Sequence, residues 1–185
     1  MGRSAIIGNH FSFLRNGITV DSTVVGVDSK PDNDPTTNWT DYELGCMESG
    51  SVNNDVQEEA VRCPIAGGGA YQEADSFALQ QNLSVNMVLK ELNPTLWQII
   101  WMTDTITDGG SGTGAFVPLA AGAFLKGWGR MDQYDESNVL VSYAEFWCQI
   151  RLNGNVDFSE AVTSVPVSCK VFSNALNTGV LSSFF

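Results

Sequence analysis

Apolar and polar residues alternate most clearly along residues 77–89, FALQQNLSVNMVL. A period of two over this length predicts a β-strand with one buried and one polar face. The polar face consists of amides and hydroxyls without a charged group, and it includes Gln80, Asn82, Ser84 and Asn86.

Further strands are predicted from runs rich in β-branched and aromatic residues. Residues 11–27 contain Asn16-Gly17 between two such runs, which is a strong hairpin signal. Two weaker strands are predicted at residues 42–47 and 56–63, with turns between them. Residues 123–133, 139–152 and 165–172 complete the set.

Two glycines interrupt the strand at residues 123–133. Gly127 and Gly129 stand at alternate positions, which predicts a bend or a close approach of another backbone.

The period changes after residue 92. Asn93-Pro94 supplies an N-cap and a proline at the first helical position, so we predict a helix over about residues 93–103. Its apolar stripe, Leu96, Trp97, Ile100 and Trp101, indicates that the helix packs on a sheet.

Residues 139–152 present two different faces. One carries Leu140, Ala144, Phe146, Cys148, Ile150 and Leu152 and is expected to face the core. The other carries Val139, Val141, Tyr143, Glu145, Trp147, Gln149 and Arg151. A face that mixes aromatic, charged and apolar residues is typical of contacts between subunits.

These elements predict one domain over residues 1–185. Its fold class is mainly β, an antiparallel β-sandwich or barrel with one short flanking α-helix. The chain has 185 residues, which suffices for one buried core without disulfides or metals.

Composition excludes several classes of function. The net charge of −12 opposes nucleic-acid binding by neutralisation of phosphates. No apolar run approaches the roughly 20 residues of a transmembrane helix. The four cysteines, Cys46, Cys63, Cys148 and Cys169, show no close pair that would indicate zinc. Their disulfide state stays open, although the chain reads as a protein with reduced thiols.

Candidate chemistry is sparse, so we expect no enzymatic activity and no catalytic, metal or cofactor residues. His10 is the only histidine and would have to support a catalytic triad alone. Asp28, Asp32 and Asp34 lack the glycine and the distant glutamate of a calcium loop.

The order of elements resembles that of the major tail tube proteins of long-tailed, siphovirus-like bacteriophages. The resemblance begins with NWTDYELG, residues 38–45, after an N-terminal hairpin and a polar loop. It continues through the acidic stretch ESGSVNNDVQEE, the alternating strand FALQQNLSVNMVL and the helix NPTLWQIIWM.

The resemblance implies a structural virion protein without a cofactor. Copies would form hexameric rings that stack into a tail tube, and DNA would pass through the tube without specific binding. Tape-measure, tail-tip and terminator proteins would be further partners, with no membrane involved. The protein would be made in the cytoplasm of the bacterial host and reside in the virion tail.

An extended loop or hairpin over about residues 44–63 would bridge stacked rings. The predicted contacts between subunits are Trp39, Leu44, Glu48, Asp55, Glu58, Glu59, Tyr143, Glu145, Trp147 and Arg151. Gln80, Asn82, Ser84 and Asn86 are the predicted lining of the lumen, because uncharged polar groups do not grip a passing cargo.

Three alternatives remain at this stage. Another virion subunit, such as a capsid decoration or tail-completion protein, also fits a small acidic β domain. A carbohydrate-binding β-sandwich would use Trp39, Tyr143 and Trp147 as a stacking platform. A hydrolase with paired carboxylates has the least support, because nothing in the spacing of the acidic residues requires one.

Overall fold

The computed structural model describes residues 6–30, 39, 42–64, 71–91, 93–108, 114–118, 124–156, 164–172 and 180–181. Within these ranges, side chains are not described for residues 6–7, 58–64, 71–81, 104–108, 114–118 and 180–181. The elements are β1 (Ile6–Arg15), β2 (Thr19–Val20), β3 (Thr23–Val24), β4 (Glu43–Pro64), β5 (Tyr71–Leu89), α1 (Pro94–Trp101), β6 (Thr103–Asp108), β7 (Gly114–Pro118), β8 (Leu125–Asp135), β9 (Leu140–Leu152), β10 (Val165–Val171) and β11 (Val180–Leu181).

Six strands close into an antiparallel barrel. The sheet runs in the order β10-β5-β4-β1-β8-β9-β11, and β10 also pairs with β9. That additional pairing joins the two sides of the sheet, so each barrel strand has a neighbour on both sides. The predicted fold class, mainly β with one short helix, is confirmed.

The inner face of the barrel is filled by one apolar cluster. Its members come from every barrel strand and from α1, and they include Phe11, Phe13, Leu44, Val85, Leu89, Leu96, Ile99, Phe146, Ile150 and Val167. Small barrels of this kind leave room only for side chains. Each large apolar side chain buried in this way contributes about 1.5–3 kcal/mol.

Helix α1 begins where the sequence predicts. The Asn93 side chain accepts a hydrogen bond from the Leu96 amide at 2.8 Å, and Met102 ends the helix in the left-handed conformation. The predicted apolar stripe is only partly correct. Leu96 and Ile99 are the buried positions, whereas Trp101 is 56% exposed, because the helix packs across one end of the barrel rather than flat on a sheet.

The N-terminal hairpin forms at a different turn from the one predicted. Asn16 and Gly17 do make a turn, but β1 pairs with β4 and β8 rather than with the residues that follow it. The hairpin turn is Asp21-Ser22, between β2 and β3. Both residues have positive φ, as a type I′ turn requires.

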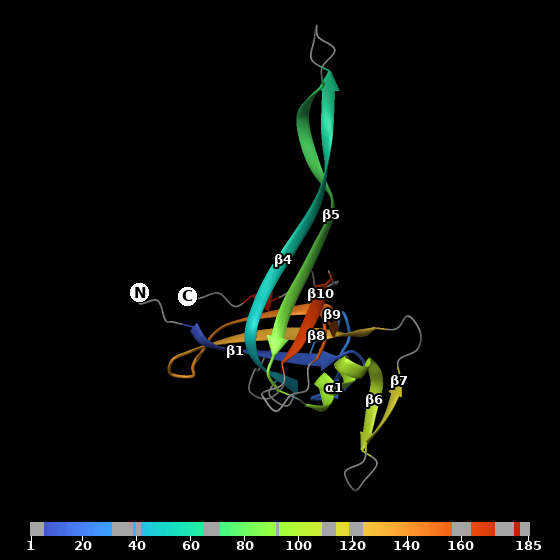
Figure 1. Cartoon of the computed structure of the whole chain (residues 1–185), viewed down its shortest axis with the longest axis vertical. Helices are drawn as coiled ribbons and strands as arrows, with labels where there is room; N and C mark the ends of the chain where they lie inside the picture. Colours follow the sequence, from blue (N-terminus) through green and yellow to red (C-terminus); the bar gives the residue numbers. More distant parts are fainter. Residues whose placement is uncertain are drawn as a thin grey trace.

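The two weak strands predicted at residues 42–47 and 56–63 are one continuous strand, β4. It pairs with β5 from Met47 opposite Leu89 to Pro64 opposite Tyr71. Together they form a long hairpin that projects far beyond the barrel (Figure 1). The polar residues between the two predicted strands do not make turns. Their backbone pairs with β5, so they stay in the extended conformation of β4.

Close approach of two backbones explains Gly127. A Cβ at this position would lie 2.1 Å from the carbonyl oxygen of Leu14, on the adjacent strand β1. The predicted close backbone approach is therefore confirmed at Gly127.

Gly127→Ala should destabilise the protein by about 2–3 kcal/mol, because the backbones of β1 and β8 must separate to admit the methyl group. The matched control is Gly8→Ala, since a Cβ at Gly8 would make only an ordinary contact at 3.7 Å. Urea denaturation of both variants measures the difference. Equal stabilities would contradict the packing described here.

Candidate functional site

The most prominent feature is the part of the β4–β5 hairpin beyond the barrel, which we call the arm. It comprises residues 55–64 and 71–82, because β5 pairs with β10 from Leu83 onward. The arm carries the acidic residues Asp55, Glu58, Glu59, Glu73 and Asp75 and one basic residue, Arg62. The residues predicted as an extended loop or hairpin, 44–63, lie within the single strand β4, and the second strand of the hairpin is β5.

The predicted contact residues on β4 differ in position. Glu48 and Asp55 are exposed, and Glu48 forms an ion pair with Lys90 at 2.9 Å. Glu58 and Glu59 lie in the arm, but their side chains are outside the described residues. Leu44 is fully buried in the barrel, which makes it a core residue.

Three further contact candidates lie inside the protomer, contrary to the prediction. Trp39 is 1% exposed, Glu145 1% and Trp147 6%. The outer face of β8 and β9 is covered by the segment that includes β2 and β3. A second apolar cluster forms there from Leu14, Val20, Val25, Trp39, Trp128 and Trp147.

Specific contacts hold this cover in place. The Trp128 indole donates to the Gly26 carbonyl at 2.9 Å, and its ring meets Trp147 edge-on with centroids 5.8 Å apart. A sugar could not stack on the buried Trp39 and Trp147 rings, so the carbohydrate platform of the alternative hypothesis does not form.

The same cover buries a cluster of four charged groups. Arg130 donates to Asp132 at 2.6 Å and to Glu145 at 3.0 Å, and Lys30 forms an ion pair with Glu145. The Arg130 guanidinium also lies 4.1 Å from the centre of the Tyr143 ring. Removing one partner from such a buried pair costs about 3–5 kcal/mol, because an uncompensated charge remains.

The buried charge cluster explains why two polar residues, Tyr143 and Glu145, stand on the outer face of β9 even though the N-terminal segment covers much of that face. Tyr143 is half-buried above Arg130, and Glu145 is the acceptor shared by Arg130 and Lys30. Sequence reasoning missed Arg130 and Asp132 because they are separated from Glu145 along the chain and meet only through the β8–β9 register.

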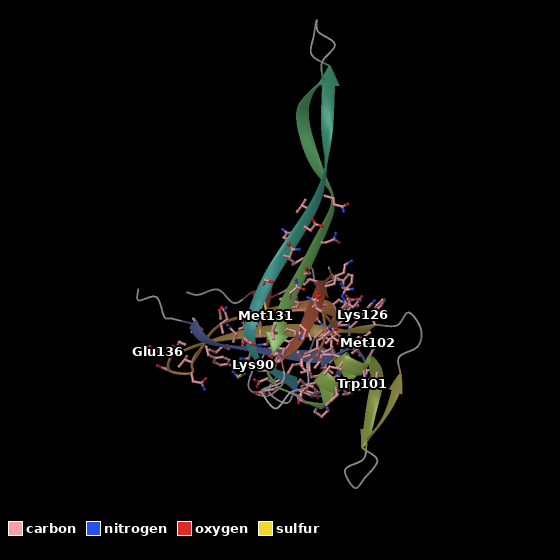
Figure 2. The ribbon with its side chains drawn as sticks, in the orientation of Figure 1. Lys90, Trp101, Met102, Lys126, Met131 and Glu136 are labelled. Carbon is pink, nitrogen blue, oxygen red and sulfur yellow. The ribbon has the colours of Figure 1, made fainter. Side chains whose placement is uncertain are left out.

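Beyond the covered region, the outer face of the barrel carries an exposed basic strip. Lys126, Gln149 and Lys170 lie in register across β8, β9 and β10, and Arg151 lies on the same face. All three basic side chains are exposed. Both lysines stand over the Phe172 ring, at 5.9 and 5.7 Å from its centroid. Figure 2 shows Lys126 and Glu136 at opposite ends of the barrel.

The predicted lumen residues adjoin this strip. Asn82, Ser84 and Asn86 are half-buried, and the side chain of Gln80 is outside the described residues. Ser84 is paired with Lys170 and Asn86 with Ser168. The uncharged row therefore continues into a positively charged surface, which the sequence pattern alone did not indicate.

His10 belongs to a small group on β1 and β4. Its Nδ1 contacts the Glu43 carboxylate, and its Nε2 lies 3.7 Å from the Cys46 sulfur. Partial burial, Glu91 and Glu43 raise the pKa of the Cys46 thiol. A thiol with a raised pKa is the opposite of an activated nucleophile.

The arrangement of other polar groups limits the candidate chemistry. Among the residues that the structure describes, no three His, Cys, Asp or Glu side chains gather closely enough to hold a metal ion. Asp32 and Asp34 lie outside those residues. Cys46, Cys148 and Cys169 carry free thiols, whereas the side chain of Cys63 is not described. The described part of the chain contains no helix with the length and apolar character of a membrane span.

Comparisons with known proteins give only weak similarities, all of them to solved structures. No protein-family model and no curated protein matches the chain. One solved structure with a similar chain is the six-fold symmetrised baseplate of the anti-feeding prophage (AFP). That chain is 11% identical with a TM-score of 0.49, over 100% of this chain and 99% of the other. At this level the similarity establishes neither a family nor a function.

The buried charge cluster makes stability depend on pH. Burial raises the pKa of Asp132, Arg130 partly offsets this rise, and Glu145 adds to it. Because the folded protein holds this proton more tightly than the unfolded chain does, the contribution of Asp132 to stability falls as pH rises through the raised pKa.

Asp132→Asn removes this ionisation and retains an oxygen that can accept from Arg130. The difference in free energy of unfolding, mutant minus wild type, should therefore become more positive as pH rises from about 4. Urea denaturation at a series of pH values tests this slope. If this difference stays constant or falls as pH rises, the pKa of Asp132 is not raised in the folded protein.

Proposed function

We propose that the chain is a structural subunit of a phage-tail-type assembly. Copies form rings, and the rings stack into a tube that conducts the genome. The observation that carries this proposal is the arm, whose two strands project from the barrel, with no other described element beside them (Figure 1).

Physical reasoning about isolated hairpins supports a partner for the arm. A two-stranded hairpin alone is marginally stable in water, and its outer edges offer unpaired backbone groups. Val52, at its base, is 63% exposed and Val56, on the arm, is 39% exposed. Contact with a second protein surface would bury these groups and order the arm.

Charge indicates which surface receives the arm. The chain as a whole carries −12, so copies repel one another unless opposite charges meet locally. The acidic arm and the exposed basic strip of Lys126, Lys170 and Arg151 are complementary in charge. We place the arm of one copy on the basic strip of a copy in the adjacent ring.

This placement changes the role of the uncharged row. Lys170, beside Ser84, would attract DNA phosphates and slow a passing genome. Asn82, Ser84 and Asn86 therefore suit the contact between rings better than the lumen wall. The remaining acidic surface would supply a wall that repels DNA over about 8 Å at physiological salt.

The rest of the functional hypothesis follows from the assembly. Six copies per ring is the expected number, and tape-measure, tail-tip and terminator proteins are the expected partners besides the chain itself. The tube would lie in the virion tail after synthesis in the bacterial cytoplasm. A decoration or tail-completion subunit would instead stop at a closed ring or trimer, so open-ended stacking separates the two functions.

Excision of the arm should abolish stacking and leave a folded barrel. The excision replaces residues 56–81 by Asn-Gly, because Asp55 is paired with Asn82 and a two-residue type I′ turn can close the shortened hairpin. Negative-stain electron microscopy, before and after concentration, measures assembly, and thermal denaturation checks the fold.

The control is the full-length chain, prepared and concentrated in the same way. Long tubes from the excised variant would contradict the bridging role. A folded excised variant that forms single rings would support it, because contacts within a ring would then be separate from contacts between rings.

Reversing the basic strip should weaken assembly through charge. Lys126→Glu with Lys170→Glu should raise the concentration needed for stacking about tenfold or more, since each lost ion pair contributes about 0.5–1 kcal/mol. Adding Asp55→Lys and Glu58→Lys to the same chain should restore assembly in part. Glu136→Lys, at the other end of the barrel, is the control and should have little effect. No rescue by the combined variant would exclude the pairing of arm and strip.

A further inference from the structure

The barrel is open on the side where β1 and β4 separate. These strands pair only between His10–Ser12 and Glu43–Cys46. Beyond that pairing, β1 continues beside β8, and β4 continues beside β5. A groove of about 320 Å³ lies between the two diverging pairs. We call it the mouth groove, and its lining includes Asn9, Met47, Val52, Val85, Met131 and Ala144.

The mouth groove is incomplete within one copy. Most of its lining is apolar, and Val52 is 63% exposed. The Oδ1 atom of Asn9 is buried, and no group in the described part of the chain donates a hydrogen bond to it. Exposed apolar side chains and an unpaired buried acceptor are both features that a second surface would cover. The groove therefore has the chemistry of a binding site for an apolar group.

The other end of the barrel carries two exposed aromatic side chains. Trp101, at the end of α1, is 56% exposed, and Phe124, directly before β8, is 50% exposed. Figure 2 shows Trp101 on the same side of the barrel as Lys126 and opposite Glu136. Tryptophan is enriched among the residues that contribute most to binding between proteins, because it buries a large apolar area. We call Trp101 and Phe124 the aromatic end.

Charges are also sorted between the two ends of the barrel. Outside the buried cluster, the basic residues of β1, β8 and β9 lie at the aromatic end, and the acidic residues of β8 and of the turn after it lie at the mouth end. They are Arg15, Lys126 and Arg151 at the aromatic end and Asp135 and Glu136 at the mouth end. Opposite charges would therefore meet where the aromatic end of one copy approaches the mouth of another. A single charge at such a rim adds little affinity, so charge would orient the copies and apolar contact would hold them together.

We propose that the aromatic end of one copy docks in the mouth groove of the next copy, with Trp101 as the central contact. The contact joins two different surfaces, so copies follow one another head to tail and form a ring if the rotation between them closes. This inference rests on the proposed function, because it identifies the contact within each ring of the tube. The arm takes no part, since the groove lining on the hairpin ends at Val52 and Val85, before the arm begins.

The test uses two full-length variants that each disable one side of the contact. Trp101→Glu removes the aromatic anchor and keeps the groove, whereas Val52→Glu places a charge at the groove and keeps the aromatic end. Both positions are exposed, so each variant should keep its fold, which thermal denaturation checks. Sedimentation velocity measures assembly. Alone, each variant should need at least about tenfold higher concentration to form rings than the unchanged chain does.

A mixture of the two variants separates loss of this contact from a general loss of stability. The intact aromatic end of Val52→Glu can dock in the intact groove of Trp101→Glu, but neither remaining side of that pair can continue. An equal mixture should therefore form dimers that neither variant forms alone, and no closed rings. Val24→Glu, at a 58% exposed position on β3 outside both surfaces, is the matched control for the added charge and should assemble like the unchanged chain.

Several results would overturn the inference. Assembly of Trp101→Glu at the same concentration as the unchanged chain would do so, and so would a mixture without dimers. Dimers of Val52→Glu alone would show that two aromatic ends pack on each other instead.

The proposed tube and this contact can fail separately. Rings that do not stack would leave the contact in place and contradict the tube. Tubes that form from Trp101→Glu would contradict the contact and leave the tube in place.

Discussion

Pairing of β10 with β9 closes the barrel, and most other features depend on this closure. A closed sheet has a single inside, so the apolar residues of all six strands and α1 meet in one cluster. Closure also removes the free edges that would invite further strands. The hairpin of β4 and β5 is the exception, because it continues after the barrel has ended.

The closed barrel also has an outer face. Apolar residues on that face need another segment to cover them, and positions without such a cover are polar. Over β8 and β9 the N-terminal segment covers it, and the cover buries two tryptophans from these strands together with Arg130, Asp132 and Glu145. Where the cover ends, the same strands carry the exposed basic strip. One sheet therefore carries both a buried ionic cluster, beneath the N-terminal segment, and an exposed basic strip beyond that segment.

The acidic arm and the basic strip belong to one chain whose net charge is strongly negative. In the proposed assembly, long-range repulsion would keep copies apart, and local charge complementarity would specify how they meet. Such a balance favours ordered contacts over general aggregation. The proposed assembly would also separate two roles, because the barrel would supply stability and the arm would supply the contact between rings.

Local patterns determined much of this protein in advance. Alternation predicted β5 and β9, the Asn93-Pro94 signal predicted the start of α1, and the glycines of β8 predicted a close approach. These features depend on neighbours along the chain, which a sequence displays directly. The acidic character of residues 48–59 was also visible in the sequence.

The tertiary structure alone decided which residues share a face and which face is covered. The mixed face of β9 looked like a subunit contact, yet Trp147 and Glu145 are buried beneath the N-terminal segment. Likewise, Lys126 and Lys170 form one strip only through the pairing of three strands. Strand register and the covering of a face by another segment depend on the packing of residues distant in sequence. The local alternation along a strand is the same whether its outer face is covered or exposed, so the sequence pattern does not distinguish the two.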